Sequence, residues 1–232
     1  MHNYSFEDVL KSLSQEPLKV IDLSISLQKY TPLDLSLANA ALASINVSSS
    51  KALDTYVYNH LKQNDATVAF GGYLEQRGIY NRSSYFNQDN PDTERNIHLG
   101  LDLWADAGTS VHAVLDGFIH SFKNNTNYGD YGPTIILKHD VEGVSFFTLY
   151  GHLGLESLVD KKVGDRVVQG QQIATLGTAE VNGDYPPHLH FQIIKNIQHY
   201  VGDYPGVSSK QDIEFYKQNC PDPNLLLKIK IV

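Results

Sequence analysis

Two short stretches of the chain alternate polar with apolar residues and carry histidine at polar positions. They run from His98 to Leu103 (HLGLDL) and from His188 to Ile193 (HLHFQI). Successive side chains of a strand point to opposite faces, so this alternation predicts two strands that bury one face each. The polar positions are His98, Gly100 and Asp102 in the first stretch, and His188, His190 and Gln192 in the second.

The remainder of the chain after about residue 66 has the pattern of short strands separated by turns. Glycine-containing turns such as Asp116-Gly117 and Glu142-Gly143 divide this part of the sequence. The predicted strands cover residues 109–114, 134–138, 146–150, 166–168 and 173–176. Short strands with frequent turns are typical of an antiparallel sandwich or barrel, so the fold is predicted to be mainly β.

The first 65 residues have a different character. Residues 6–13 and 49–61 show helical periodicity, and a serine run that can cap a helix precedes the second of them. Residues 20–25 between them are a possible strand. We therefore expect a small helical or mixed N-terminal extension over residues 1–65 and a β domain over residues 66–232.

Composition narrows the class of protein further. The 232 residues are 41% hydrophobic and 19% charged, as in ordinary globular proteins. The net charge of −8 disfavours nucleic acid as a partner, and the single cysteine, Cys220, allows neither an intrachain disulfide nor a cysteine zinc site. The N-terminus has no signal-peptide pattern and no stretch is long and apolar enough to span a membrane, so a cytoplasmic location is expected unless a leader was removed.

The two alternating stretches carry the side chains of a metal site. Two histidines and one carboxylate, with a fourth position left open, are typical of a catalytic rather than a structural zinc. His98 and Asp102 would lie about 13 Å apart in a fully extended strand, which is too far for two side chains on one ion. The strand is therefore predicted to bend, and Gly100 is the position where a bend costs least.

Six motifs, in order, resemble those of the lysostaphin-type (LytM-like) zinc metallopeptidases of family M23. They are HLGLD, TSVHAVLDG, GDYGPTIILKH, TLYGHL, VGDRVVQGQQIATLG and PPHLHFQI, and they span about residues 95–195. The resemblance implies an antiparallel two-sheet β fold of the hybrid-motif sandwich kind, with an open groove. It also implies that His98, Asp102 and His190 hold one zinc ion per chain and that His152 and His188 are catalytic.

The same resemblance implies hydrolysis of peptide bonds, usually in peptidoglycan, by a zinc-activated water that the two histidines assist. Histidine can replace the glutamate base of helical zinc proteases, because its ordinary pKa lies near 6.5. One of His152 and His188 would orient or deprotonate the water, and the other would bind the developing oxyanion.

Some features depart from the family pattern and leave the substrate open. Pro186-Pro187 replace the usual glycine before the second histidine pair, and the Asn124–Tyr131 loop is also distinctive. These features resemble a sub-branch whose domain is found fused to kinase-like and aminotransferase-like domains. A peptide, a muropeptide or another small amide would fit, and the oligomeric state stays open.

Two alternatives come from other classes of protein. One is a non-catalytic binding or activator module on the same scaffold. The other is a histidine phosphocarrier-like domain that would use His152 or His188 as the acceptor without needing Asp102.

Other residues are assigned by their place relative to the motifs. His139, at the end of an apolar stretch, is predicted to be structural. Aromatic residues in loop-like stretches and two residues before the first motif are candidate groove walls. They are Arg77, Tyr80, Trp104, Tyr128, Tyr131 and Tyr185.

Overall fold

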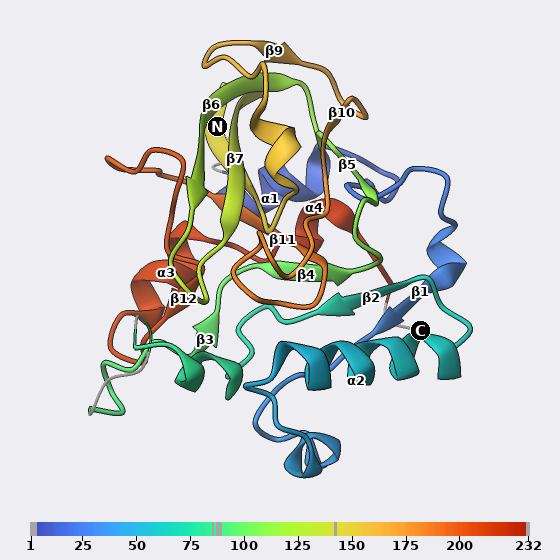
Figure 1. Ribbon diagram of the computed structural model, residues 1–232. Coiled ribbons are helices and arrows are strands. Elements are labelled where there is room, and N and C mark those ends of the chain that lie inside the picture. Colours follow the sequence, from blue (N-terminus) through green and yellow to red (C-terminus); the bar gives the residue numbers. More distant parts are fainter. Residues whose placement is uncertain (1–3, 85, 87–89, 142, 231–232) are drawn as a thin grey trace.

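One large sheet dominates the computed structural model, which describes residues 4–84, 86, 90–141 and 143–230 (Figure 1). Its eight strands lie in the order β1-β2-β4-β11-β8-β7-β6-β9. Their bounds are β1 (Tyr30–Pro32), β2 (Val68–Gly71), β4 (Leu101–Trp104), β6 (Gly117–Asn125), β7 (Gly132–Val141), β8 (Val144–Gly151), β9 (Arg166–Val167) and β11 (His188–Ile194). The prediction of a mainly β fold is therefore confirmed.

Two small sheets accompany the large one. β5 (Ser110–His112) pairs with β10 (Gln172–Thr175), and β3 (Ile97–His98) pairs with β12 (Val207–Ser208), both antiparallel. All pairs of the large sheet are antiparallel except β1 with β2, which is parallel. The five strands predicted after residue 105 coincide at least in part with β5, β7, β8, β9 and β10.

The first alternating stretch forms two strands rather than one. β3 ends at His98 and belongs to a small sheet, whereas β4 begins at Leu101 in the large sheet. The interruption falls at Leu99-Gly100. A Cβ on Gly100 would lie 2.6 Å from the His190 imidazole, so only glycine lets the chain pass this close.

The register of the central strands sets the positions of the polar side chains. On β11, His190 lies opposite Asp102 of β4 on one side and opposite Gly151 of β8 on the other. The alternate positions Leu189, Phe191 and Ile193 are fully buried in the main hydrophobic core. The alternation in the sequence thus separates a core face from a polar face, as expected from the strand period.

The N-terminal residues pack against the same core. α1 (Phe6–Ser12) begins at a Ser5 capping box, and Leu10 and Ile21 are fully buried in the main core. α2 (Ser50–Gln63) contacts β2 and runs along the edge of the sheet at the bottom of the view (Figure 1). The domain boundary at residue 65 stays a prediction.

The prediction of a strand over residues 20–25 is wrong in extent. Only Ile21 forms a β-bridge, with Val111, and residues 22–25 form a turn instead. Asp22 causes this, because its carboxylate accepts hydrogen bonds from the Ser24 amide and hydroxyl.

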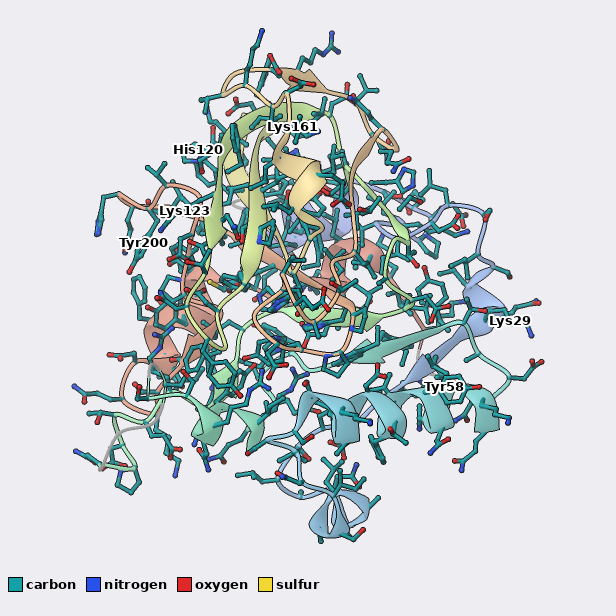
Figure 2. The ribbon with its side chains drawn as sticks, in the orientation of Figure 1. Lys29, Tyr58, His120, Lys123, Lys161 and Tyr200 are labelled. Carbon is teal, nitrogen blue, oxygen red and sulfur yellow. The ribbon has the colours of Figure 1, made fainter. Side chains whose placement is uncertain are left out.

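Short helices complete the chain. The 3₁₀ helices are η1 (Leu27–Lys29), η2 (Ala40–Ser44), η3 (Ile79–Arg82) and η4 (Leu155–Leu158), and two α-helices follow β12, α3 (Ile213–Asn219) and α4 (Asn224–Leu227). None of the helices in the described ranges has the length and apolar character needed to cross a bilayer. The side chains of Lys29 and Tyr200 lie near opposite edges of the view (Figure 2).

Candidate metal centre

Strands of two different sheets bring five polar side chains to one place. His98 ends β3, Asp102 lies in β4, and His188 and His190 lie in β11. His152 follows β8 directly. Donor atoms of His98, Asp102 and His190 all lie within 4.8 Å of one another, and no other such group of three was found among the described residues.

The donor atoms have spacings close to those of a tetrahedral metal site. Asp102 Oδ1 lies 3.2 Å from His98 Nε2 and 3.2 Å from His190 Nδ1, and these two nitrogens are 2.8 Å apart. Ligands at 2.0–2.2 Å from a tetrahedral zinc would be roughly 3.3–3.5 Å apart. The three atoms would need to separate only slightly to hold such an ion.

In His98 and His190, the ring nitrogen that points away from Asp102 faces an oxygen acceptor, and this determines the tautomer of each ring. His98 Nδ1 lies 3.0 Å from the Gly72 carbonyl oxygen, and His190 Nε2 lies 2.9 Å from Gln192 Oε1. An oxygen acceptor requires the proton on the facing nitrogen, so each neutral ring has its lone pair on the inner nitrogen. Two nitrogen lone pairs and a carboxylate oxygen then face one point, an arrangement that favours a cation.

Gln192 is itself held in place. Its amide nitrogen donates to the Pro205 carbonyl at 3.1 Å and lies 3.3 Å from Cys220 Sγ. These contacts orient the Oε1 atom towards His190, so the tautomer of His190 depends on residues beyond the strand.

His152 and His188 form a second pair beside the first. Their ring centroids are 4.2 Å apart, and each Nδ1 faces a backbone carbonyl, that of Asn182 at 2.7 Å and that of Pro186 at 2.8 Å. Each Nδ1 therefore donates, and each Nε2 is left as a base. His188 Nε2 lies 3.9 Å from Asp102 Oδ1, close to the three donor atoms.

The backbone at His152 adopts a conformation that non-glycine residues rarely adopt. Its φ is 62°, in the left-handed region. The His152 amide donates to the Tyr131 carbonyl at 2.9 Å, and Nδ1 donates to Asn182, so both ends of the residue are held. Such local strain is concentrated at functional sites.

Burial disfavours the charged form of three of the histidines. All five side chains lie in residues that are at most 5% exposed. Burial lowers the pKa of His98 to about 3, and it also lowers the pKa of His188 and holds the pKa of His152 well below its usual value. Burial raises the pKa of the Asp102 carboxyl, but His98 and the Arg77 guanidinium outweigh it and leave that pKa well below its ordinary value.

Five of the six candidate groove residues line a cavity beside the site, and one does not. A cavity of about 150 Å³ adjoins the five side chains, and its lining includes Arg77, Tyr80, Trp104, Tyr131 and Tyr185. Trp104 stacks on His188 at 5.7 Å between ring centroids, and the Tyr131 hydroxyl lies 3.4 Å from His190 Nε2. Tyr128 does not line the cavity; the residue is 51% exposed, and its ring lies under the Arg82 guanidinium.

The other motif histidines lie in separate hydrogen-bond networks. His139 is fully buried and bonds the Asp116 carbonyl and the Thr148 hydroxyl, as its structural prediction requires. His112 bonds the Gly170 carbonyl and the Ser110 hydroxyl.

Sequence reasoning missed the ion pair between Arg77 and Asp102. Arg77 Nη1 lies 2.5 Å from Asp102 Oδ2, although Arg77 lies before the first motif and Asp102 lies within it. A buried arginine cannot be told from an exposed one by residue type, so only the fold reveals this pair.

Comparison with known proteins assigns the class. Residues 96–201, called the family domain below, match the model of Peptidase family M23. The chain is similar to the peptidoglycan DD-endopeptidase ShyC of Vibrio cholerae, at 36% identity over 100 residues that cover 43% of this chain and 20% of ShyC. It is also similar to the glycyl-glycine endopeptidase ALE-1 of Staphylococcus capitis, at 38% identity over 99 residues that cover 43% of this chain and 25% of ALE-1.

Among solved structures, the catalytic domain of lysostaphin from Staphylococcus simulans is similar at 29% identity with a TM-score of 0.36. That match covers 53% of this chain and 80% of the lysostaphin domain. The chain thus spans about a quarter or less of the length of ShyC and ALE-1.

Proposed function

We propose that this protein is a zinc-dependent hydrolase of peptide bonds, either a peptidoglycan-type endopeptidase or a hydrolase of a related amide. The observation that carries the proposal is the convergence of two imidazole lone pairs and Asp102 Oδ1 on one point. A structural role would not require three buried acceptors to face one another, because each buried acceptor without a donor costs free energy. A bound cation removes that cost.

His98, Asp102 and His190 would hold the zinc ion. Asp102 Oδ1 is buried and has no hydrogen-bond partner among the described residues, as expected of a ligand atom. A zinc ion there would polarise the scissile carbonyl and lower the pKa of a bound water.

His152 and His188 would handle the protons of the reaction. Each presents a neutral Nε2 towards the cavity, because its Nδ1 donates to a backbone carbonyl. Two imidazoles 4.2 Å apart in a buried site resist carrying two positive charges, so the pair would hold at most one added proton. One ring can then take a proton from the water while the other donates to the oxyanion or the leaving amine.

The relatives support peptide cleavage as the reaction. ShyC is a peptidoglycan DD-endopeptidase and ALE-1 is a glycyl-glycine endopeptidase. The site side chains are nearly inaccessible, which favours short peptides or muropeptides as substrates.

The test combines metal analysis with a substrate panel. The purified chain is expected to contain one zinc per chain and to cleave members of a peptide and muropeptide panel, as read by mass spectrometry. A chelator should stop cleavage, and added zinc should restore it. Zinc without cleavage would favour the binding module, and a phosphorylated histidine without zinc would favour the phosphocarrier.

A further inference from the structure

A buried guanidinium lies between two carboxylates beside the candidate metal centre. Arg77 is 4% exposed, and its Nη1 lies 2.5 Å from Asp102 Oδ2 while its Nε lies 2.5 Å from Glu75 Oε2. Glu75 is fixed from the other side, because its Oε1 accepts from the Leu35 amide at 2.9 Å. The result is a chain of contacts from the backbone at Leu35 to the carboxylate of Asp102.

The two oxygens of Asp102 therefore have separate roles. Oδ2 is taken by Arg77, whereas Oδ1 lies 3.2 Å from the inner nitrogens of His98 and His190. A carboxylate with one oxygen bound to a guanidinium has only the other oxygen left for a metal. Asp102 would consequently bind zinc through a single oxygen and keep a position open for water.

The same arginine also contacts the ring that supports His188. Its guanidinium carbon lies 5.5 Å from the centroid of Trp104, and Trp104 stacks on His188. A planar guanidinium can bond a carboxylate along its edge and lie against an aromatic ring with its face, which a lysine ammonium cannot do.

The backbone before the family domain passes close to the Arg77 side chain, which requires a glycine at position 72. Gly72 has a φ of +106°, and a Cβ there would lie 2.0 Å from Arg77 Nη2 and 3.0 Å from His98 Nδ1. The Gly72 carbonyl is also the acceptor for His98 Nδ1. The short segment 72–77 thus contacts two of the three candidate ligands, although it precedes the matched residues 96–201.

We propose that Arg77 is a positioning residue of the zinc site, which restricts Asp102 to one metal-facing oxygen and offsets its charge. This inference rests on the proposed function, since it concerns the same zinc. It extends the site beyond the family domain to the segment 72–77. Residues that orient metal ligands by hydrogen bonds commonly contribute about 10–100-fold to metal affinity.

The experiment measures zinc affinity of the full chain by competition with a chromophoric chelator, for the wild type, Arg77→Met and Arg77→Lys. Arg77→Met is expected to weaken zinc binding by about 10–100-fold. Arg77→Lys should weaken it by a smaller factor, because lysine keeps the charge but cannot bond Asp102 and Glu75 at once in the geometry of the planar guanidinium. Cobalt substitution adds a spectroscopic readout. The visible absorption of the Met variant should weaken, since a freed Asp102 can bind through both oxygens and raise the coordination number.

Arg82→Met is the matched control. Arg82 is equally buried, with a side chain 3% exposed against 5% for Arg77, and it also pairs with an aspartate, Asp184 at 3.2 Å. Because Arg82 makes none of the contacts to Asp102, its variant should bind zinc as tightly as the wild type.

Two outcomes separate this inference from the proposed function. Wild-type zinc affinity and an unchanged cobalt spectrum in Arg77→Met would overturn the role of Arg77 and leave the zinc site intact. A wild type that binds no zinc would overturn the proposed function itself. If Arg77→Met does not fold, Arg77→Lys decides alone, and wild-type affinity in that variant would overturn the inference.

Discussion

The candidate site has two walls of different origin. The strand wall consists of His98, Asp102, His152, His188 and His190, all within the family-matched residues 96–201. The flanking wall consists of residues 72–80 and 203–207, which lie outside that range and contribute Arg77, Tyr80, Tyr204 and Pro205 to the cavity. The five side chains proposed for the chemistry lie in the matched residues, whereas the chain around them borders the cavity and contacts Asp102 through Arg77.

The strand wall is positioned by sheet register, which leaves little freedom. Asp102, His190 and Gly151 lie opposite one another in three hydrogen-bonded strands. The flanking wall joins the strand wall at the edge of the site, through backbone hydrogen bonds such as Leu99 to Gly206 and through side-chain contacts such as Arg77 to Asp102. Changes in the strand wall should therefore abolish activity, and changes in the flanking wall should tune it.

The largest effect is expected from loss of a ligand in the strand wall. His98→Ala and Asp102→Ala should each lower zinc affinity by more than the roughly 10–100-fold that an orienting partner contributes, and hydrolysis should stop. Zinc content after dialysis and turnover of the best substrate are the measurements. Stoichiometric zinc in both variants would place the metal elsewhere.

A second effect separates metal binding from proton transfer within the strand wall. His152→Ala and His188→Ala should keep zinc but lower turnover by about 10²–10⁴-fold, the usual contribution of a positioned acid or base. Zinc content is measured beside kcat for each variant. Near-normal turnover in either variant would end the catalytic assignment of that histidine.

The flanking wall should appear as a restriction on substrate size. Short muropeptides should be cleaved at least several-fold faster than intact cross-linked wall material, because the site residues are at most 5% exposed. Product release from equal amounts of cleavable bonds is compared by mass spectrometry. Faster cleavage of intact wall would indicate that the flanking wall opens in solution.

The smallest effect concerns a histidine outside both walls. Burial lowers the pKa of His139, so the folded state resists its protonation. This penalty is absent above the ordinary pKa of about 6.5 and grows as pH falls from there towards the lowered pKa. His139→Gln should therefore flatten the loss of stability below pH 6.5, by at most about 1.4 kcal/mol per pH unit.

Chemical denaturation at several pH values between 5 and 8 measures that slope. Removing the imidazole also costs its hydrogen bonds to Asp116 and Thr148, so the variant is expected to be less stable at pH 8 by about 1 kcal/mol. A slope identical to that of the wild type would show that His139 takes up no additional proton on unfolding.

The sequence predicted those parts of the molecule that have a local signature. Strand alternation placed His188 and His190 on one face with Leu189 and Phe191 on the other, and the spacing of His98 and Asp102 required the interruption that occurs at Gly100. The roles of the five site residues stay predictions, although the structure brings all five side chains together.

Contacts between residues far apart in the chain could not be predicted from the sequence, for physical reasons. The pair of Arg77 with Asp102 joins residues 25 positions apart, and the carbonyl of Gly72 that orients His98 has no residue-type signature at all. The parallel pairing of β1 with β2 also has no signature in the sequence. Its three residue pairs depend on where the chain returns to the sheet after α2. Backbone acceptors and crossovers depend on topology, which periodicity does not encode.

Asp102, His190 and Gly151 lie side by side on neighbouring strands, so the site depends on which face of β11 each residue occupies. Inserting a single residue between His188 and His190 would leave one of the two histidines on the hydrophobic side of β11, away from the ion site. Inserting two would restore the faces with a shifted alignment. The even-numbered spacing between these histidines is therefore as much a requirement of the site as the histidines themselves.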